Sequence, residues 1–304
     1  MRRERGVAAV TAVLIVAVAA STAALMLAQQ SAMLDQTALV AARSQADYFA
    51  RAGLDWSRGI LAQDAITSGG YDGLDEDWAQ PIAGLPVERA VVSGALVDEQ
   101  GKFNLNNLLN GTQRSDADMQ VFQRLLASLD LPVELADAVL DWIDPDSDVS
   151  GNGGAENPYY LSLPKPYRAA NRMMVQVEEL YRVRGFDAAT VAKLRPYVTA
   201  LPGRTAVNVN TASDVVLQAL LPTVGKEKIA NLIASRRFTP LKNPQMVSDW
   251  AKEASALVPA SLDVKSGYFG ARIQVAQDDV QLATDALLAR SQGNVTVVWQ
   301  RPRY

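Results

Sequence analysis

Hydrophobic residues fill the chain almost without interruption just after its N-terminus. The basic leader Met1-Arg2-Arg3-Glu4-Arg5-Gly6 precedes an apolar run of 22 residues over 7–28, and no charged residue occurs between Gly6 and Leu34. A helix needs about 20 apolar residues to cross the hydrocarbon core of a membrane. The pattern therefore predicts a membrane-spanning helix over 7–28, with the basic leader on the cytoplasmic side.

The helical pattern continues past the apolar run to about Gln63. Residues spaced alternately three and four apart form one stripe: Leu39, Ala42, Ala46, Phe49, Gly53, Trp56 and Ile60. A helix over 7–63 would be about 85 Å long at 1.5 Å per residue. We expect the C-terminal half of the stripe to pack on the protein's own sheet and the Ala-rich part to suit packing against other helices. The residues assigned to helix packing are Thr11, Ala42, Ala46 and Phe49.

A cleaved secretory signal peptide is the alternative interpretation of the apolar run. Such a peptide needs only about 7–15 apolar residues before a small-residue cleavage site. Ala23 and Ala24 have the small size that such a site requires. The run is longer than that and no turn follows it, which favours a retained helix.

Strand-like and helical periods alternate in the rest of the chain. Strand-type segments over 87–97 and 102–108 flank Asp98-Glu99-Gln100-Gly101, which predicts a hairpin with Gly101 in the left-handed region. Strands return over 268–277, 280–289 and 294–301. Between them, helices are expected near 116–128, 133–142, 175–184, 188–195, 212–220, 226–236 and 244–253.

The strands predicted before and after the helical block need partners, because an isolated hairpin is only marginally stable. The predicted class is α+β: a long N-terminal membrane-spanning helix packed on an antiparallel sheet, with a large inserted all-helical domain. The expected division is a leader over 1–6, a long helix over 7–64, a sheet domain over 65–110 and 258–304, and a helical insert over 111–257.

The composition excludes several classes of function. The 304 residues include no His and no Cys, and the net charge is −4. Ser-His-Asp catalysis and His-ligated zinc are therefore excluded, and an acidic chain has no general attraction to nucleic acid. We expect a protein that is not an enzyme. A hydrolase using a pair of carboxylates is a remote alternative.

An acidic loop is the strongest candidate for a binding site. Between 141 and 156 the chain has five carboxylates and no Lys or Arg: Asp141, Asp144, Asp146, Asp148 and Glu156. Calcium takes 6–8 oxygen ligands from flexible loops, and the Gly-rich stretch that follows suits that need. The EF-hand pattern fails, because Val149 stands where that loop has Gly and Ala155 where it has Glu. We predict a Ca²⁺ site of another kind, and the alternative is a solvated acidic turn.

Two segments, over 179–187 and 220–226, each place a glycine before a helix. They resemble the helix–hairpin–helix modules of DNA-binding proteins, in which amides at a helix N-terminus hold a phosphate. Lys226 and Lys228 would assist such binding, whereas Thr223 replaces the usual first glycine. We favour a structural role, so no nucleic-acid partner is expected. A membrane-anchored DNA-binding protein of an uptake apparatus is the alternative function.

Taken in order, four segments resemble the type II secretion system minor pseudopilin K family, also called general secretion pathway protein K. They are Arg5-Gly6-Val7, the stretch 98–108 that opens with Asp98-Glu99-Gln100-Gly101, the acidic stretch 141–148 with Gly154-Ala155-Glu156, and Val207-Asn208-Val209-Asn210-Thr211-Ala212. The resemblance covers nearly the whole chain. Each segment alone is weak, and the combination is specific.

This resemblance implies a location and a role. Prepilin peptidase would cut after Gly6, and Val7 would be methylated. The helix and sheet would be pilin-like, the insert would bind calcium, and the body would lie in the periplasm on a single inner-membrane anchor. The implied partners are the minor pseudopilins I and J at the tip of the pseudopilus and the inner-membrane assembly platform, with secreted substrates or the outer-membrane secretin as further candidates. The implied function is to help initiate pseudopilus assembly and protein export.

Thr11 is a departure from the wider pilin pattern that fits this family. The fifth residue after the cleavage point is usually Glu in pilins, and the K family typically lacks it. An unpaired charge inside a bilayer is costly, and Thr11 has no charge to pair. This fits a subunit at the end of the fibre.

Overall fold

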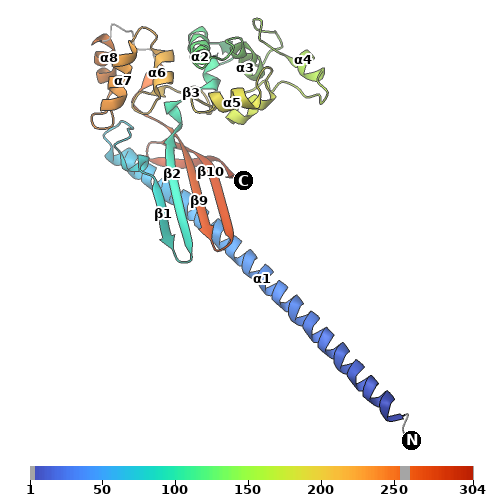
Figure 1. Cartoon of the computed structure of the whole chain (residues 1–304). Helices are drawn as coiled ribbons and strands as arrows, with labels where there is room; N and C mark the ends of the chain where they lie inside the picture. Colours follow the sequence, from blue (N-terminus) through green and yellow to red (C-terminus); the bar gives the residue numbers. More distant parts are fainter. Residues whose placement is uncertain (1–3, 254–260, 304) are drawn as a thin grey trace.

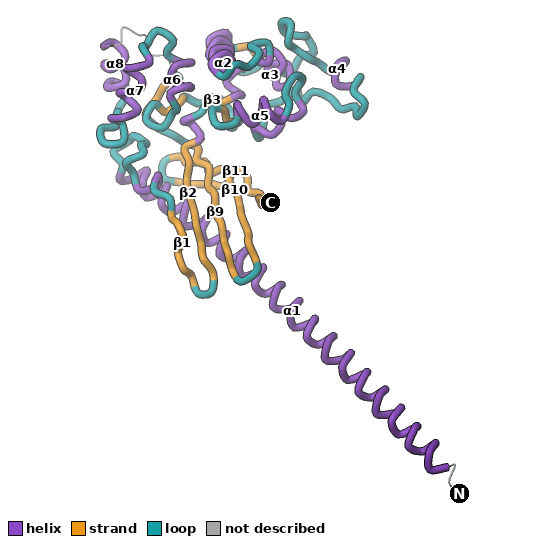
Figure 2. Tube along the Cα trace, viewed as in Figure 1, coloured by secondary structure: helices purple, strands orange, loops and turns teal. Residues whose placement is uncertain are grey.

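A long helical rod has a sheet beside its C-terminal part and a separate helical part beyond the sheet (Figures 1 and 2). The computed structural model describes residues 4–253 and 261–303. Residues 1–3 of the expected leader lie outside the described residues, as do 254–260, where the insert was expected to end, and Tyr304. The rod, the antiparallel sheet and the separate helical part confirm the predicted α+β class.

The rod is the helix α1, Glu4–Thr67, and its continuity confirms the predicted long helix. Its hydroxyl side chains do not interrupt it, because they donate to carbonyls of the preceding turn, as Thr11 Oγ1 does to Val7 O at 3.1 Å. The most apolar 18-residue window has a mean hydropathy of 2.4 and none of it is buried in the protein. By length and composition, the helix can cross a membrane.

One five-stranded antiparallel sheet lies against the C-terminal part of α1. Its strand order is β1-β2-β9-β10-β11. The strands are β1 Ile82–Val87, β2 Ala90–Asp98, β9 Tyr268–Gln277, β10 Val280–Ser291 and β11 Asn294–Arg303. The strands that precede the insert and those that follow it meet where β2 pairs with β9, in a register that sets Asp98 opposite Phe269.

The face of α1 that packs on the sheet differs in part from the predicted stripe. Ala46 and Phe49 are buried, but Trp56, in the half of the stripe that was expected to pack on the sheet, is 51% exposed. In its place Leu54 and Leu61 are buried. A stripe spaced three and four residues apart follows a period of 3.5, and a straight helix of 3.6 residues per turn drifts away from it by about 20° per heptad.

The predicted hairpin around Asp98-Glu99-Gln100-Gly101 is wrong. β2 pairs with β1 instead, through a turn in which Glu88 has a φ of 53°. Residues Glu99–Gly101 form a 3₁₀ helix (η2), because the Asp98 side chain accepts a hydrogen bond from Gln100 N and turns the chain into the helical part. The expected second strand is only β3, Phe103–Asn104, which pairs in parallel with β6, Val198–Thr199.

Helices fill the insert nearly where the periodicity predicts them. They are α2 Asp116–Ser128, α3 Leu135–Ile143, α5 Ala188–Leu194, α6 Asp214–Leu220, α7 Lys226–Ser235 and α8 Pro244–Glu253. The helix expected over 175–184 is a 3₁₀ helix (η4), Val177–Arg182, and the short α4, Asn157–Leu161, was not predicted. The remaining elements are the 3₁₀ helices η1 Asp77–Ala79 and η3 Leu105–Leu108 and the two-residue strands β4 Leu109–Asn110, β5 Gln113–Arg114, β7 Val207–Asn208 and β8 Leu262–Asp263.

The apolar cores of the two parts are separate. The large core of the insert runs in sequence from Phe103 to Val264. Two smaller clusters, around Leu61 and around Ile273, hold only residues of α1, η1 and the five-stranded sheet. By packing, the insert therefore extends beyond 111–257 at both ends.

Candidate functional site

The acidic loop begins inside α3 and ends at the N-terminus of α4. Asp141 lies in the last turn of α3, is fully buried and accepts a hydrogen bond from Ser150 N at 3.1 Å. Asp144 follows the last residue of the helix, and Glu156 caps α4 by accepting from Asn157 N. The loop thus returns to its own starting point, which brings residues 12 positions apart together.

Three of the five predicted ligands converge. Carboxylate oxygens of Asp144, Asp146 and Glu156 lie within 4.8 Å of one another. Asp144 is 5% exposed and Glu156 is 1% exposed. The buried oxygens Asp144 Oδ1 and Glu156 Oε1 have no hydrogen-bond partner among the described residues. Buried polar atoms normally have a partner, so this trio has the free oxygens that a cation requires.

Burial and mutual repulsion raise the pKa values of these groups. Desolvation raises the pKa of Asp144 to about 7, and the charges of Asp146, Asp141, Glu156 and Asp148 add to the shift. Desolvation likewise raises the pKa of Glu156. Like charges held together out of water disfavour the ionised form, and a bound cation would reverse that preference.

The other two predicted ligands stand beside the trio. Asp141 has its carboxylate turned to Ser150 N, and desolvation raises its pKa. Asp148 contributes its backbone N, which donates to Asp146 Oδ1 at 2.9 Å. The ligand set of Asp141, Asp144, Asp146, Asp148 and Glu156 remains a prediction.

Asn171 belongs to this neighbourhood and was missed from the sequence. Its Nδ2 donates to Asp146 O at 2.8 Å, and its Oδ1 is buried without a hydrogen-bond partner in the described chain. It lies 25 residues after Asp146 on a separate loop. A neutral residue at that distance carries no sequence signal for a cation site.

Glycines allow the loop to close this tightly. Gly151 has a φ of 53°, in the left-handed region. A Cβ on Gly153 would overlap the carbonyl of Glu134, and one on Gly154 would overlap Ser150 O and the Asp141 carboxylate. Because these glycines have no side chain, the backbone of the loop can lie directly against Glu134 and Asp141.

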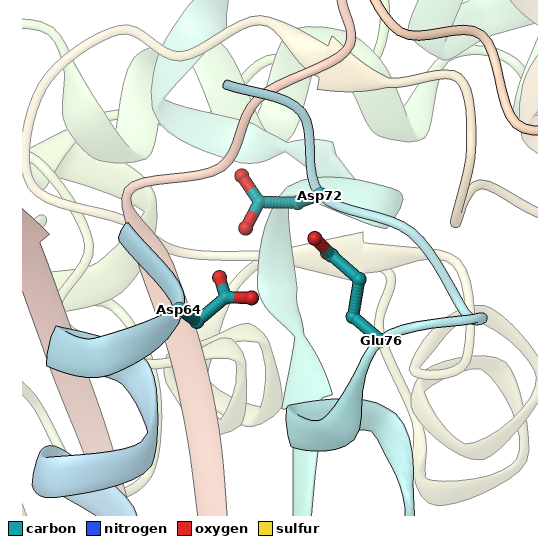
Figure 3. Close-up of side chains that lie close together, drawn as sticks. All are labelled: Asp64, Asp72 and Glu76. Atoms are coloured by element: carbon teal, nitrogen blue, oxygen red, sulfur yellow. The ribbon is translucent and has the colours of Figure 1, made fainter. Parts of the chain in front are cut away.

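A second carboxylate trio shows the contrast. Asp64 at the end of α1 and Asp72 and Glu76 from the following loop point toward one another (Figure 3). Here Arg290 of β10 supplies the positive charge: its Nη1 bonds Asp64 Oδ2 at 2.6 Å and its Nη2 bonds Asp72 Oδ1. A guanidinium thus pairs with two of these three carboxylates, whereas no Lys or Arg of the described chain forms an ion pair with Asp144, Asp146 or Glu156.

The segments 98–101 and 207–212 meet in a buried junction between the sheet and the insert. Asp98 accepts hydrogen bonds from Gln100 N, Asn208 Nδ2, Thr211 Oγ1 and Ser266 Oγ, at 2.6–2.9 Å. Burial raises the pKa of Asp98 to about 6. Asn208 Nδ2 also donates to Asp72 O at 3.0 Å. These residues join the two parts of the molecule.

The four helix-packing residues take different positions. Thr11 is exposed on the part of α1 that can cross a membrane, and Ala42 is half-buried. Ala46 and Phe49 are buried against the sheet, in the cluster around Ile273.

The two segments that resemble helix–hairpin–helix modules contribute to the core of the insert. Leu220, Leu221 and Val224 are buried there, and Gly225 caps α7 in extended backbone. Phe186, which follows Gly185, is also buried in that core. These contacts favour the structural role over DNA binding.

Comparisons with known proteins give one consistent result. Two family models, both described as Type II secretion system (T2SS), protein K, match residues 101–203 and 207–270. The type II secretion system protein K of Aeromonas hydrophila is 32% identical over 99% of this chain and 97% of its own length. That of Pectobacterium carotovorum subsp. carotovorum is 30% identical over 97% and 95%.

A solved structure is also similar. It is a chain of the GspK-GspI-GspJ complex from the type 2 secretion system of enterotoxigenic Escherichia coli. The TM-score is 0.72 at 25% identity, over 86% of this chain and 96% of that chain.

Proposed function

Because the chain belongs to the type II secretion system protein K family, we propose that it is the minor pseudopilin at the tip of the pseudopilus, where it helps initiate assembly and export of folded proteins. The observation that carries this proposal is the similarity, over most of the chain, to a protein solved in complex with GspI and GspJ. A membrane-anchored rod with a separate head fits a subunit of a fibre. Among the described residues we identify no group of side chains arranged for catalysis.

The position of the insert supports the place at the tip. The insert lies beyond the end of α1 that is farthest from the membrane-spanning part (Figure 1). A broad head at that end would obstruct the stacking of another subunit above it. Fibres grow through head-to-tail contacts, so a chain that blocks one of the two contacts ends the fibre.

The anchor and the leader complete the proposal. The apolar part of α1 is a single candidate membrane span near the N-terminus. Prepilin peptidase would remove the leader after Gly6 and leave a methylated Val7 in the inner membrane, with the body in the periplasm. Mass spectrometry of the mature N-terminus tests this directly: methyl-Val7 is expected, and a start near Ala23 would contradict it.

The partners are tested by co-purification. Full-length chain expressed with proteins I and J in membranes should co-purify with both after detergent extraction. Deletion of the chain should reduce the number of pseudopili and the export of substrates. If I and J assemble fully and never co-purify with this chain, the proposed function is wrong.

Calcium is proposed as a structural cofactor of the acidic loop. An all-oxygen site with buried carboxylates suits a hard cation, and calcium accepts the irregular geometry of such a loop. A cation that binds only the folded state adds stability according to its concentration and affinity. We expect a chelator to lower the melting temperature of the full chain, and calcium to restore it more effectively than magnesium.

A matched pair of aspartate substitutions provides the control for the calcium experiment. Asp146→Asn removes one charge of the trio and should weaken calcium binding. The same change at Asp278, an exposed aspartate in the β9–β10 turn, should leave binding unchanged. Identical calorimetric transitions with calcium and with chelator would show that the loop needs no cation.

A further inference from the structure

A basic patch lies at one end of the insert. Two stretches of the insert, 157–171 and 180–186, contain no Asp or Glu. They carry the four exposed cations that make up the basic patch, which are Lys165, Arg168, Arg182 and Arg184. In the described parts of the chain none of the four forms an ion pair, whereas Arg172, between the two stretches, pairs with Glu179. The basic patch is therefore a surplus of positive charge in a chain whose net charge is −4.

The two stretches are held against each other around Tyr160, which is fully buried. Tyr160 Oη accepts a hydrogen bond from Arg184 N at 3.3 Å, and the Tyr160 carbonyl accepts one from Tyr167 N at 3.4 Å. Tyr167 Oη donates to Arg182 O at 2.8 Å. The Arg184 guanidinium lies over the ring of Tyr159, 5.1 Å from its centre. Because these contacts fix the surface in advance, a ligand does not have to order it on binding.

Apolar side chains are exposed beside these charges. Tyr159 and Leu161 of α4 are 37% and 48% exposed. Pro164 and Pro166, which flank Lys165, are exposed as well. Aromatic and arginine side chains together are typical of a binding surface. The ligand that matches this surface has negative charges and a few apolar side chains.

The bilayer is out of reach of the basic patch. From residue 28, where the predicted span ends, α1 continues to Thr67, which is about 58 Å at 1.5 Å per residue. The insert lies beyond that end of the helix (Figure 1). Exposed charges are largely screened beyond about 10 Å at 0.1 M salt. Anionic lipid headgroups of the anchoring membrane are therefore not the ligand.

Nucleic acid fits the basic patch less well than a short acidic segment of a protein does. Non-specific binding to a duplex depends on several phosphate contacts, and the rest of this chain is acidic and repels a long polyanion. A protein segment with a few carboxylates needs only the four cations of the patch. Segments with runs of like charge remain disordered and often serve as interaction tails.

A second copy of the chain is also a poor ligand. Its acidic loop is the nearest source of negative charge, and Asp146 and Asp148 are exposed there. Asp146 belongs to the trio proposed to hold calcium, which leaves only Asp148 of the exposed pair for the four cations. Within one chain the acidic loop already contacts the basic patch, because Arg184 Nη1 donates to Gly154 O at 2.7 Å.

We propose that the basic patch binds a flexible acidic segment of another protein. The Asp and Glu side chains of that segment pair with the four cations, and its apolar side chains pack on Tyr159 and Leu161. The proposal gives the insert a function besides calcium binding and the block on stacking. It places that function at the end of the insert opposite to α7 and α8 (Figure 1).

Fluorescence anisotropy of a labelled peptide tests the proposal on the full chain in detergent micelles. The probe consists of Glu-Gly-Glu-Leu repeats, and its control has Gln in place of Glu. Calcium is present throughout, so that the charge of the neighbouring acidic loop stays constant. The Glu peptide should bind and the Gln peptide should not. A rise in salt from about 0.1 M to about 1 M should weaken binding severalfold, because the screening length falls from about 10 Å to about 3 Å.

Substitutions in the basic patch should weaken this binding. The triple variant Lys165→Gln, Arg168→Gln and Arg182→Gln should bind the Glu peptide about tenfold less tightly, since each exposed ion pair contributes modestly and three are lost. Its melting temperature should be that of the parent chain, because these three side chains are exposed. If the triple variant is less stable, Arg168→Gln alone serves, with an expected loss of about twofold.

The matched control removes the same charge from the other end of the insert. It is the triple variant Lys226→Gln, Lys228→Gln and Arg237→Gln, in and just after α7. It should bind the Glu peptide as tightly as the parent chain does. An equal loss in both triple variants would mean that binding follows the net charge alone, and the proposal would be wrong.

Other ligands of the basic patch would also overturn the proposal. Duplex DNA or vesicles of anionic lipid that displaced the Glu peptide at lower concentration would be the better ligand. Self-association of the parent chain that is lost in the patch variant would assign the patch to a second copy. Equal binding of the two peptides, or no binding of the Glu peptide, would likewise contradict the proposal. None of these measurements involves I or J, so their outcome leaves the proposed function untouched.

Discussion

At the scale of single residues, Asp98 shows how one carboxylate holds two parts of the molecule. Its oxygens accept four hydrogen bonds, from η2, from two residues of the segment 207–212 and from Ser266 before β9. An ionised carboxylate is purely an acceptor and matches four donors, whereas an amide presents two donors of its own.

Asp98→Asn should therefore destabilise the fold. One amide N–H₂ would face a donor such as Gln100 N, and an unsatisfied buried group costs about 1–3 kcal/mol. Urea unfolding at pH 7.5 measures the change in the free energy of unfolding. Asp278→Asn serves as the control, because its pair with Arg89 is exposed. Equal stability of both variants would show that the junction does not depend on this carboxylate.

The residues of the candidate site were predictable to different degrees. The trio Asp144, Asp146 and Glu156 could be found because its members lie close in sequence and no basic residue accompanies them. Asn171 could not, since a neutral side chain on another loop leaves no pattern. The second trio was also invisible, because Arg290 follows Asp72 by 218 residues and only the fold brings them together.

At the scale of elements, Arg290 ties α1 to the sheet. The guanidinium of β10 bonds Asp64 at the end of α1, Asp72 in the next loop and Ser266 O, and it lies over the ring of Phe269 at 4.7 Å. All of its charged partners are buried or nearly so. Removing the Arg290 guanidinium would leave the carboxylates of Asp64 and Asp72 buried without a counter-charge.

Arg290→Met should cost about 3–5 kcal/mol of unfolding free energy at pH 7.5. The loss should shrink as the pH falls. Burial already raises the pKa values of Asp64 and Asp72 and raises the pKa of Glu76 to about 7, and removal of the guanidinium raises them further. A carboxyl whose pKa is higher in the folded state than in the unfolded state favours folding at low pH and opposes it as the pH rises through the folded pKa.

Thermal unfolding from pH 5 to pH 8 follows this dependence. The variant should approach the parent chain at pH 5 and fall away from it above pH 7. Arg89→Met is the matched control, since its salt bridge to Asp278 is exposed and worth little. A deficit independent of pH would mean that Arg290 acts through packing alone.

Elements were predictable where their own period identifies them. α2 was predicted over its full extent, and β9 and α8 likewise, because each shows an unbroken helical or alternating pattern. The hairpin at Asp98 was wrong because pairing is not local. β2 continues into the insert and finds its second neighbour in β9, some 170 residues later, and no alternation of side chains encodes that partner.

At the scale of the whole molecule, two bodies with separate cores share one chain. The insert leaves the sheet after Asp98 and returns at Phe269, and these two residues are direct partners across β2 and β9. The gap that the insert bridges is therefore only the width of a hairpin. A two-residue turn is the shortest connection between antiparallel strands.

Replacing residues 99–268 by Asn-Gly should consequently leave a folded body of α1 and the five strands. The clusters around Leu61 and Ile273 contain no residue of the insert, so their burial survives the excision. Since Asp98 would lose all four of its donors with residues 99–268, the excised chain should carry Asp98→Asn as well. A single cooperative transition and a strand-rich circular dichroism spectrum are the expected measurements.

The excised chain also separates the binding of I and J from the proposed functions of the insert, which include calcium binding and the block on further stacking. It keeps α1 and the five strands, so it should still co-purify with I and J. It lacks the acidic loop, and a chelator should no longer change its melting temperature. It also lacks the head that would block further stacking, so subunits should be able to add beyond it. An excised chain that unfolds, or that no longer joins I and J, would show that the head is part of the joint and that the two bodies work as one.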